Sequence, residues 1–325
     1  MTGRWLGLVL ALVALAALPA WMPGTYYVNV SSQILIYAVF ALGINVLAGY
    51  GGLVSLGHAG LFGIACYAVA VSLAAGAGHL AAILVGLAVT LLGTAVFAAL
   101  SLRTTGIGFL MITLALGQIL WGLAYRWIGV TNGDNGLTVA SRPAPFGFSL
   151  ETATAFYYAT LLTFLLGVLA MAVFANSPFG ASLAGTRDQP RRMTALGYNV
   201  WMIRFYACMF SGLLSGIAGI LFVYYNQFIS PQSLSLTASA EVVLMVIAGG
   251  TGTLMGPIVG AALVVVMKNV ASAYIERWNF LLGAIFVAIV IFMPEGLVPG
   301  TVRLLRWAMR SLAGKAVPAG GDGGR

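Results

Sequence analysis

The chain has 325 residues, of which 61% are hydrophobic and only 7% are charged. A soluble domain carries roughly a quarter charged residues, so this composition excludes a soluble enzyme and predicts a surface covered mostly by lipid. The formal net charge is +8, but the basic residues are scattered between apolar runs. That arrangement argues against a nucleic-acid partner and favours basic residues that set the orientation in a membrane.

Apolar runs of about the length of a membrane helix, roughly 20 residues, follow one another along the chain. The predicted segments are 5–22, 28–48, 53–75, 80–101, 106–128, 155–175, 204–225, 238–250, 254–274 and 277–294. The run 238–250 is too short to cross alone and ends in glycines, so we expect it to be buried against other helices. The sequence thus predicts an all-α, polytopic transmembrane helix bundle of about 9–10 membrane segments, forming a single domain over residues 1–312.

The first segment has a second interpretation, because Arg4 followed by an apolar stretch is also typical of a signal peptide. The stretch is long for that purpose and no small-x-small cleavage site closes it, which favours an uncleaved membrane helix. At the other end, residues 313–325 are rich in glycine and are expected to form a disordered tail.

Basic residues in the loops indicate the orientation, because short cytoplasmic loops are enriched in lysine and arginine. A cytoplasmic N-terminus places most of them inside, and only Arg126, Arg142 and Arg277 outside. This orientation makes both termini cytoplasmic, 129–154 an external loop and 176–203 a cytoplasmic loop. The inside residues are Arg4, Arg103, Arg187, Arg191, Arg192, Arg204, Arg303, Arg306, Arg310, Lys315 and Arg325.

Small residues four positions apart let helix backbones approach closely in lipid. Two such pairs, Gly212 with Gly216 and Gly256 with Gly260, predict a compact bundle. Cys66 and Cys208 lie in apolar runs without metal-ligand spacing, so neither a metal site nor a disulfide framework is expected. No catalytic motif occurs in the sequence.

Polar side chains within the apolar segments are costly and often functional. Asn45, Thr113 and Gln118 are expected to bond neighbouring helices or to line a path, and His58 to serve packing, hydrogen bonding or transport. Glu241 is predicted near the outer end of its segment and at a depth similar to that of Lys268. The two side chains either form an ion pair or lie separately, with Lys268 extended toward the interface.

The loop SPFGASLAGTRDQPRRMTALGYN, residues 177–199, carries the strongest local signal. Asp188 is expected to cap a helix, Pro190 suits its first turn, and Gly197 suits a left-handed residue at its end. These signals predict a two-turn helix over 189–196 that displays Arg191 and Arg192. Such a helix either lies against anionic lipid headgroups or docks a cytoplasmic partner.

This loop resembles the coupling loop of permeases in bacterial branched-chain amino acid ABC importers, in particular the LivM-type subunit. The similarity rests on SPFG at 177–180, the Arg187–Asp188 pair and ALGYN at 195–199. Further matches follow in order: SLGHAGLFGIACY at 55–67, TNGDNGLT at 131–138, GGTGTLMGP at 249–257 and PEGL at 294–297. The chain departs from the family at Ala65–Cys66, where Gly-Ala is usual, and at Arg191 and Arg192, where acids are frequent.

The resemblance implies an inner-membrane permease subunit that forms half of a translocation path for branched-chain or related amino acids. It also implies a second permease subunit, a periplasmic binding protein and two ATPase subunits. The ATPases would dock on the loop containing Arg187, Asp188, Pro190, Arg191, Arg192, Ala195, Gly197 and Asn199. The sequence itself lacks a Walker A motif, because Gly314–Lys315 has no preceding glycine at the required spacing, so no cofactor is expected on this chain.

Three other functions are compatible with the sequence. A permease of the same superfamily could carry urea, short amides or another small polar solute. An ion-coupled secondary transporter would show internal repeats with paired broken helices and membrane carboxylates, whereas one broken segment and one intramembrane acid, Glu241, are evident here. A membrane scaffold would show no substrate-dependent ATPase stimulation.

Overall fold

The computed structural model describes residues 14–21, 24–144, 149–274, 278–293, 296–301 and 303. Residues 14–21 are helical. The following elements, in chain order, are α2 Thr25–Asn45, the π-helix η1 Val46–Tyr50, α3 His58–Ala74, α4 His79–Ser101, α5 Ile107–Arg126, α6 Ile128–Thr131, the 3₁₀ helix η2 Gly133–Asn135, β1 Leu137–Thr138, α7 Ala153–Asn176, α8 Pro178–Asp188, α9 Pro190–Ala195, α10 Val200–Asn226, β2 Phe228–Ile229, the 3₁₀ helix η4 Pro231–Leu234, α11 Leu236–Gly249, α12 Gly256–Tyr274 and α13 Trp278–Phe292.

These elements confirm the all-α polytopic bundle. Five helices in the described part of the chain are long and apolar enough to cross a membrane: Thr25–Tyr50, His79–Ser101, Ile107–Arg126, Ala153–Asn176 and Val200–Asn226. The start of the first predicted segment, the Pro294–Glu295 pair and the predicted tail 313–325 lie outside the described residues.

Shorter apolar helices in the described residues include His58–Ala74, Leu236–Gly249 and the part Gly256–Ala271 of α12. The sequence predicts only one such short segment. The predicted segment 53–75 becomes helical only at His58, because residues 51–57 leave the helical path after η1. Gly52, with a φ of +66°, turns the chain there. A second irregular stretch therefore exists besides the predicted one near residue 250.

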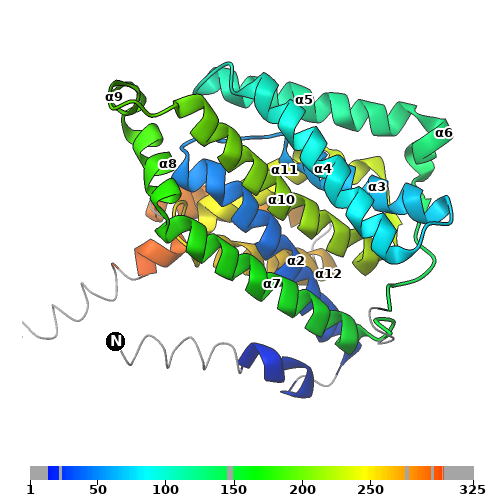
Figure 1. The fold of residues 1–325 in the computed structure, drawn as a ribbon. Helices are drawn as coiled ribbons and strands as arrows, with labels where there is room; N and C mark the ends of the chain where they lie inside the picture. The colour runs from blue at the N-terminus through cyan, green and yellow to red at the C-terminus, as the bar shows by residue number, and fades with distance from the viewer. Residues whose placement is uncertain are drawn as a thin grey trace, which may run out of the picture.

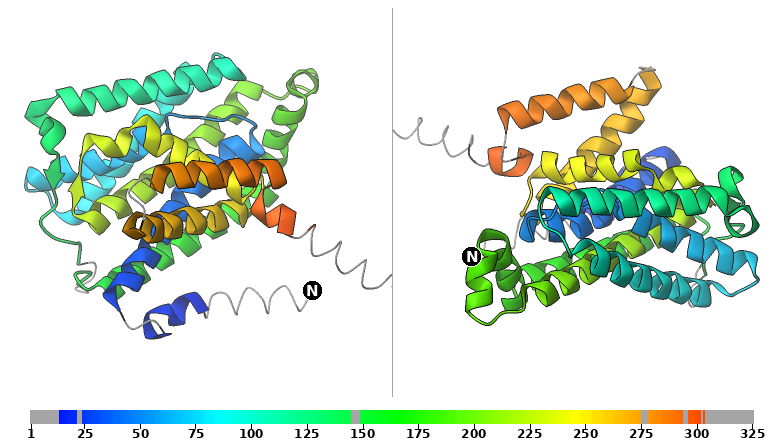
Figure 2. Two further views of the ribbon diagram at one scale, coloured as in Figure 1. Left: turned by 180° about the vertical axis from the view of Figure 1, so that it is seen from behind. Right: turned by 90° about the horizontal axis from the view of Figure 1, so that it is seen from above.

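Helix α2 is the centre of the bundle, and 72% of its most apolar window is buried. It packs against α7, α10, α11 and α12, and α10 also packs against α3 and α4 (Figure 1). Helix α13 lies at one edge, in contact with α11 and α12 (Figure 2). Because α2 is apolar on every side, it is stable only where other helices surround it.

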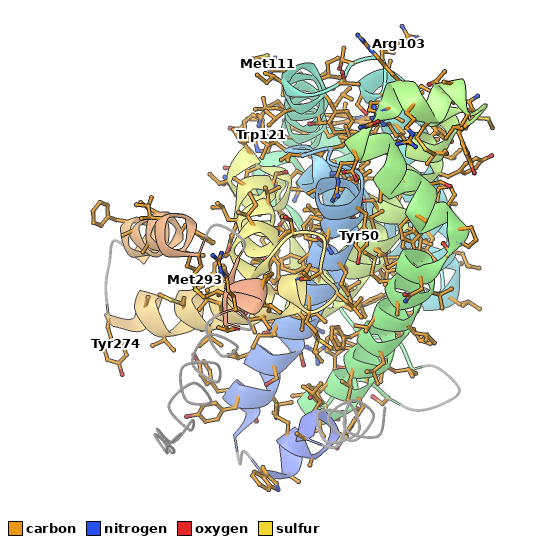
Figure 3. The ribbon with its side chains drawn as sticks, turned by 90° about the vertical axis from the view of Figure 1, so that its left-hand side faces the viewer. Tyr50, Arg103, Met111, Trp121, Tyr274 and Met293 are labelled. Carbon is orange, nitrogen blue, oxygen red and sulfur yellow. The ribbon has the colours of Figure 1, made fainter. Side chains whose placement is uncertain are left out.

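The outer helices present apolar faces to their surroundings. On α5, Ile107, Met111, Ile119 and Leu123 are exposed at spacings of one or two helical turns, and α7 has a comparable exposed row. Met111 points away from the bundle in Figure 3. Exposed apolar surface of this extent is a liability in water but is the normal outer surface of a protein in lipid.

The bundle has two distinct ends. Helices α8 and α9 lie at one end, and α6 lies at the other (Figure 1). At the α6 end, β1 pairs with β2 in antiparallel register, Leu137 opposite Ile229. Arg142 ties the same loop to the last turn of α10, where its Nε donates to the Tyr224 carbonyl at 3.1 Å. The predicted external loop 129–154 is thus joined to the α10–α11 connection.

Both predicted pairs of glycines lie at close helix crossings. A Cβ at Gly212 or Gly216 would overlap the side chain of Thr94 or Thr90 on α4. A Cβ at Gly256 or Gly260 would overlap a backbone carbonyl, that of Gly250 or of Met245. Side chains can adjust to an added methyl group, whereas the carbonyls cannot move without shifting a helix, so the crossing of α11 and α12 is the more constrained one.

We therefore expect Gly260→Ala to destabilise the protein by roughly 1–3 kcal/mol, the usual cost of overpacking a tight core. Gly122→Ala on α5 is the matched control, because nothing lies within 4 Å of the added Cβ. The thermal unfolding of both variants is measured in detergent, with the loss of monodisperse protein as the signal. A melting temperature for Gly260→Ala equal to that of Gly122→Ala would contradict the close crossing.

Candidate functional site

The loop 177–199 forms two helices joined at a sharp break. Ser177 caps α8 by accepting from the Gly180 N–H at 3.1 Å, and Pro178 occupies the first turn. The prediction that Asp188 caps the second helix was wrong, because Asp188 is the last residue of α8. The break falls at Gln189, whose φ of −145° is not helical, and its side chain caps nothing.

The rest of the second helix follows the prediction. Pro190 stands in the first turn of α9, and Gly197 has a φ of +88°, beyond the end of that helix. Asn199 caps α10, because its side-chain oxygen accepts from the Met202 N–H at 3.1 Å. The predicted docking residues Arg191, Arg192, Ala195, Gly197 and Asn199 are all exposed at the end of the bundle.

Arg187 attaches α8 to the irregular stretch after α2. Its Nη1 donates to the Gly49 carbonyl at 2.8 Å, and its Nε donates to Asp188 Oδ1 at 2.9 Å. Its aliphatic stem covers Gly52, where a Cβ would overlap the Arg187 stem. Seen from the α8–α9 end, Tyr50 of η1 lies within the bundle and Arg103 at its rim (Figure 3).

Arg204 makes the second attachment. It belongs to α10 rather than to the loop, is 9% exposed, and donates from Nη2 to the Thr186 carbonyl at 2.8 Å. A groove of 370 Å³ runs between the two short helices, lined by Gly185, Asp188, Gln189, Arg192, Met193 and Leu196. The α8–α9 element is therefore fixed at its base and open at its outer face.

The end of α2 meets the connection between α11 and α12 at Asn45. This buried side chain donates from Nδ2 to the Thr253 carbonyl at 2.9 Å and accepts at Oδ1 from the Gly252 N–H at 2.9 Å. Gly49 lies so close to Gly252 that a Cβ on Gly49 would overlap its backbone. The sequence marked Asn45 as a candidate polar residue. In the structure, its side chain satisfies two backbone hydrogen-bonding groups in the connection between α11 and α12.

His58 lies in a buried chain of hydrogen bonds. Its Nδ1 is 2.7 Å from Ser55 Oγ, and its Nε2 is 2.9 Å from Ser211 Oγ. Ser211 donates its single hydroxyl proton to the Gly43 carbonyl at 2.6 Å, so His58 Nε2 must be the donor to Ser211. The structure thus places His58 where it joins α3, α10 and α2.

Thr113 and Gln118 lie on α5 away from these contacts. Thr113 Oγ1 accepts from the Leu56 N–H at 3.3 Å, which satisfies one backbone group of the extended stretch 51–57. Gln118 is half-buried, and its side chain makes no hydrogen bond within the described part of the chain.

Glu241 and Lys268 form an ion pair between α11 and α12. Lys268 Nζ donates to Glu241 Oε1 at 3.1 Å and to Oε2 at 3.2 Å. The pair faces a cavity of 280 Å³ that Tyr37, Phe40, Phe62 and Phe222 also line. The sequence gives no signal for these aromatic residues, because three different helices bring them together.

Glu241 was expected near the outer end of its segment, and it lies in the first half of α11. The same cavity is lined by Tyr37, halfway along the span Thr25–Tyr50, and by Phe222, in the last two turns of α10. The pair therefore lies between the middle of the bundle and its α6 end.

A multi-pass helical bundle with broken inner helices and a fixed two-helix element at one end is the architecture of a membrane permease. The family described as branched-chain amino acid transport system / permease component matches residues 26–290. Because this match covers most of the sequence, the chain belongs to that family.

Individual relatives agree with this assignment. The chain is 27% identical over 322 residues to the high-affinity branched-chain amino acid transport system permease protein LivM of Salmonella typhimurium, covering 90% of this chain and 75% of the relative. The LivM protein of Escherichia coli is 28% identical with the same coverage. The autoinducer 2 import system permease protein LsrC of Yersinia pseudotuberculosis is 34% identical over 140 residues, 40% of each chain. No solved structure matches the chain.

We expect Asn45→Leu to loosen the α11–α12 connection, because a buried group that loses its hydrogen-bond partner costs roughly 1–3 kcal/mol. Faster hydrogen–deuterium exchange over residues 250–255 in detergent is the measurement. Asn176→Leu is the control, since that amide only bonds Ala172 of its own helix at an exposed end. Unchanged exchange over 250–255 would show that Asn45 does not hold the connection.

Proposed function

We propose that this chain is one permease subunit of an ATP-driven importer for branched-chain or related amino acids. The observation that carries the proposal is the family match together with the anchored α8–α9 element. An exposed pair of short helices fixed to the bundle by Arg187 and Arg204 is suited to transmit motion from a cytoplasmic partner. A helix on a flexible loop would absorb that motion instead.

The proposal assigns a side of the membrane to each end. The α8–α9 end, with Arg103, Arg187, Arg191 and Arg192, faces the cytoplasm of a bacterium and docks two ATPase subunits that bind the ATP. The α6 end faces a periplasmic binding protein, and a second permease subunit completes the path. The chain itself holds no cofactor and catalyses no reaction.

The amino-acid substrate is supported by the two LivM relatives, which are named for branched-chain amino acid transport and match 90% of the chain. The similarity to the autoinducer 2 permease covers 40% of the chain and supports another small polar solute as the alternative. Urea and short amides belong to that alternative.

Reconstituted uptake tests the function. The chain is co-expressed with the second permease, ATPase and binding-protein subunits of neighbouring genes, and the complex is placed in proteoliposomes. We expect uptake of leucine, isoleucine or valine that requires ATP and the binding protein and persists with a protonophore. Collapse of uptake with the protonophore would indicate an ion-coupled transporter. Preferential uptake of urea or an amide would overturn the proposed amino-acid substrate. Absence of substrate-dependent ATPase stimulation would indicate a membrane scaffold.

Arg187 tests the coupling. Arg187→Ala removes two charge-assisted hydrogen bonds, of which the bond to Gly49 fixes α8, so we expect the substrate moved per ATP hydrolysed to fall by about tenfold. Parallel uptake and ATPase measurements in the same vesicles give that ratio. Arg126→Ala, an exposed change at the α6 end, is the control. An unchanged ratio for Arg187→Ala would contradict a coupling role for this attachment.

A further inference from the structure

The cavity beside Glu241 and Lys268 has two chemically different walls. Phe40 of α2, Phe62 of α3 and Phe222 of α10 form an aromatic wall, in which the Phe40 and Phe62 rings stack at 4.7 Å and those of Phe62 and Phe222 lie at 5.1 Å. The rest of the lining includes the ion pair together with Ser235 and Thr237. Small-molecule sites usually enclose roughly 300–1,000 Å³, so a cavity of 280 Å³ suits one small metabolite and not a peptide.

The ion pair is open to this cavity. The Lys268 and Glu241 side chains are 34% and 17% exposed, although they lie on apolar helices of the bundle. Replacing a buried ion pair by apolar residues of similar volume is often neutral or stabilising, so packing alone does not require charges here. Ionisable residues within membrane helices commonly mark a substrate path.

We infer that this cavity is a transit subsite for the zwitterionic head of an amino acid. The inference rests on the proposed import function and assigns it recognition residues: the Glu241 carboxylate binds the α-ammonium group, and the Lys268 ammonium binds the α-carboxylate. The four-carbon stem of Lys268 lets its head move aside as the substrate enters. Without substrate, the two side chains pair with each other. With substrate bound, each pairs instead with the oppositely charged group of the amino acid.

This exchange explains why two charges are present instead of one. The Glu241–Lys268 pair has no net charge with or without a bound zwitterion, so substrate entry leaves neither charge of the pair uncompensated. Since one set of ionic contacts replaces another, binding stays weak enough for release, as a transit site requires. The aromatic wall takes an aliphatic side chain. A neutral solute such as urea offers no charge to either residue and leaves the pair closed.

Uptake by neutralised variants separates recognition from packing. Glu241→Gln and Lys268→Met each remove one charge of the pair, whereas the double variant removes both and keeps side chains of similar size. We expect leucine uptake by the complete reconstituted importer to fall by about tenfold or more in the double variant, while binding-protein-stimulated ATPase activity persists. Thr163→Val on α7, whose hydroxyl bonds only the Ala159 carbonyl of its own helix, is the control for a polar change in a membrane helix away from both ends.

Each outcome decides between explanations. A double variant that regains the uptake lost in the single variants would make the pair a packing feature and overturn the inference. A wild-type importer without ATP-dependent amino-acid uptake would overturn the proposed function and the inference with it. Loss of stimulated ATPase activity in the double variant alone would assign the pair to coupling instead of recognition.

A direct measurement needs no transport. Cys66 and Cys208 are buried, so Thr237→Cys, an exposed position on the cavity wall, provides a single reactive thiol for a charged maleimide. We expect leucine to slow the labelling severalfold, and isovalerate or isoamylamine, each with one of the two charges, to leave it unchanged. Equal protection by all three, or protection that survives Glu241→Gln with Lys268→Met, would overturn the inference.

Discussion

The structure depends on one constraint: backbone groups that leave a helix inside a membrane must find partners within the protein. Two stretches leave their helices here, residues 51–57 after η1 and residues 250–255 between α11 and α12. Asn45 satisfies one donor and one acceptor of the second stretch, and Thr113 satisfies one donor of the first. The irregular stretches are thus held by side chains from regular helices.

The same constraint connects parts of the molecule that are far apart in sequence. Arg187 binds the Gly49 carbonyl, Gly49 packs on Gly252, and Asn45 accepts a hydrogen bond from the Gly252 N–H. The α8–α9 element therefore reaches the α11–α12 connection through two sets of hydrogen bonds joined by one glycine contact. For the coupling that we propose, this series offers a physical connection from α8 to the two helices that carry the ion pair.

The sequence predicted the bundle well because long apolar runs allow few other structures in lipid. It failed where contacts between helices decide the conformation. Residues 53–57 are as apolar as a helix, and only their position beside Thr113 and Phe97 shows why they are extended. Aspartate is a residue type that often caps helices. Here, however, Ser177 and Pro178 begin α8 earlier, and that helix continues through Asp188. The aromatic residues that line the cavity beside Glu241 come from three different helices, which no local pattern indicates.

The irregular features also lie together. The shortest inner helix, α11, carries Glu241 and ends at the connection held by Asn45, and its crossing with α12 leaves no room for a methyl group at Gly260. Departures from local preference in a stable protein are expected at functional sites, where they are compensated elsewhere. The burial of α2 and α10 compensates for these departures here. Both helices bury most of their residues against neighbouring helices, whereas α4, α5 and α7 do not. The well-packed core around α2 therefore supports a costly ion pair and two broken segments, which agrees with the division between scaffold and path that we propose.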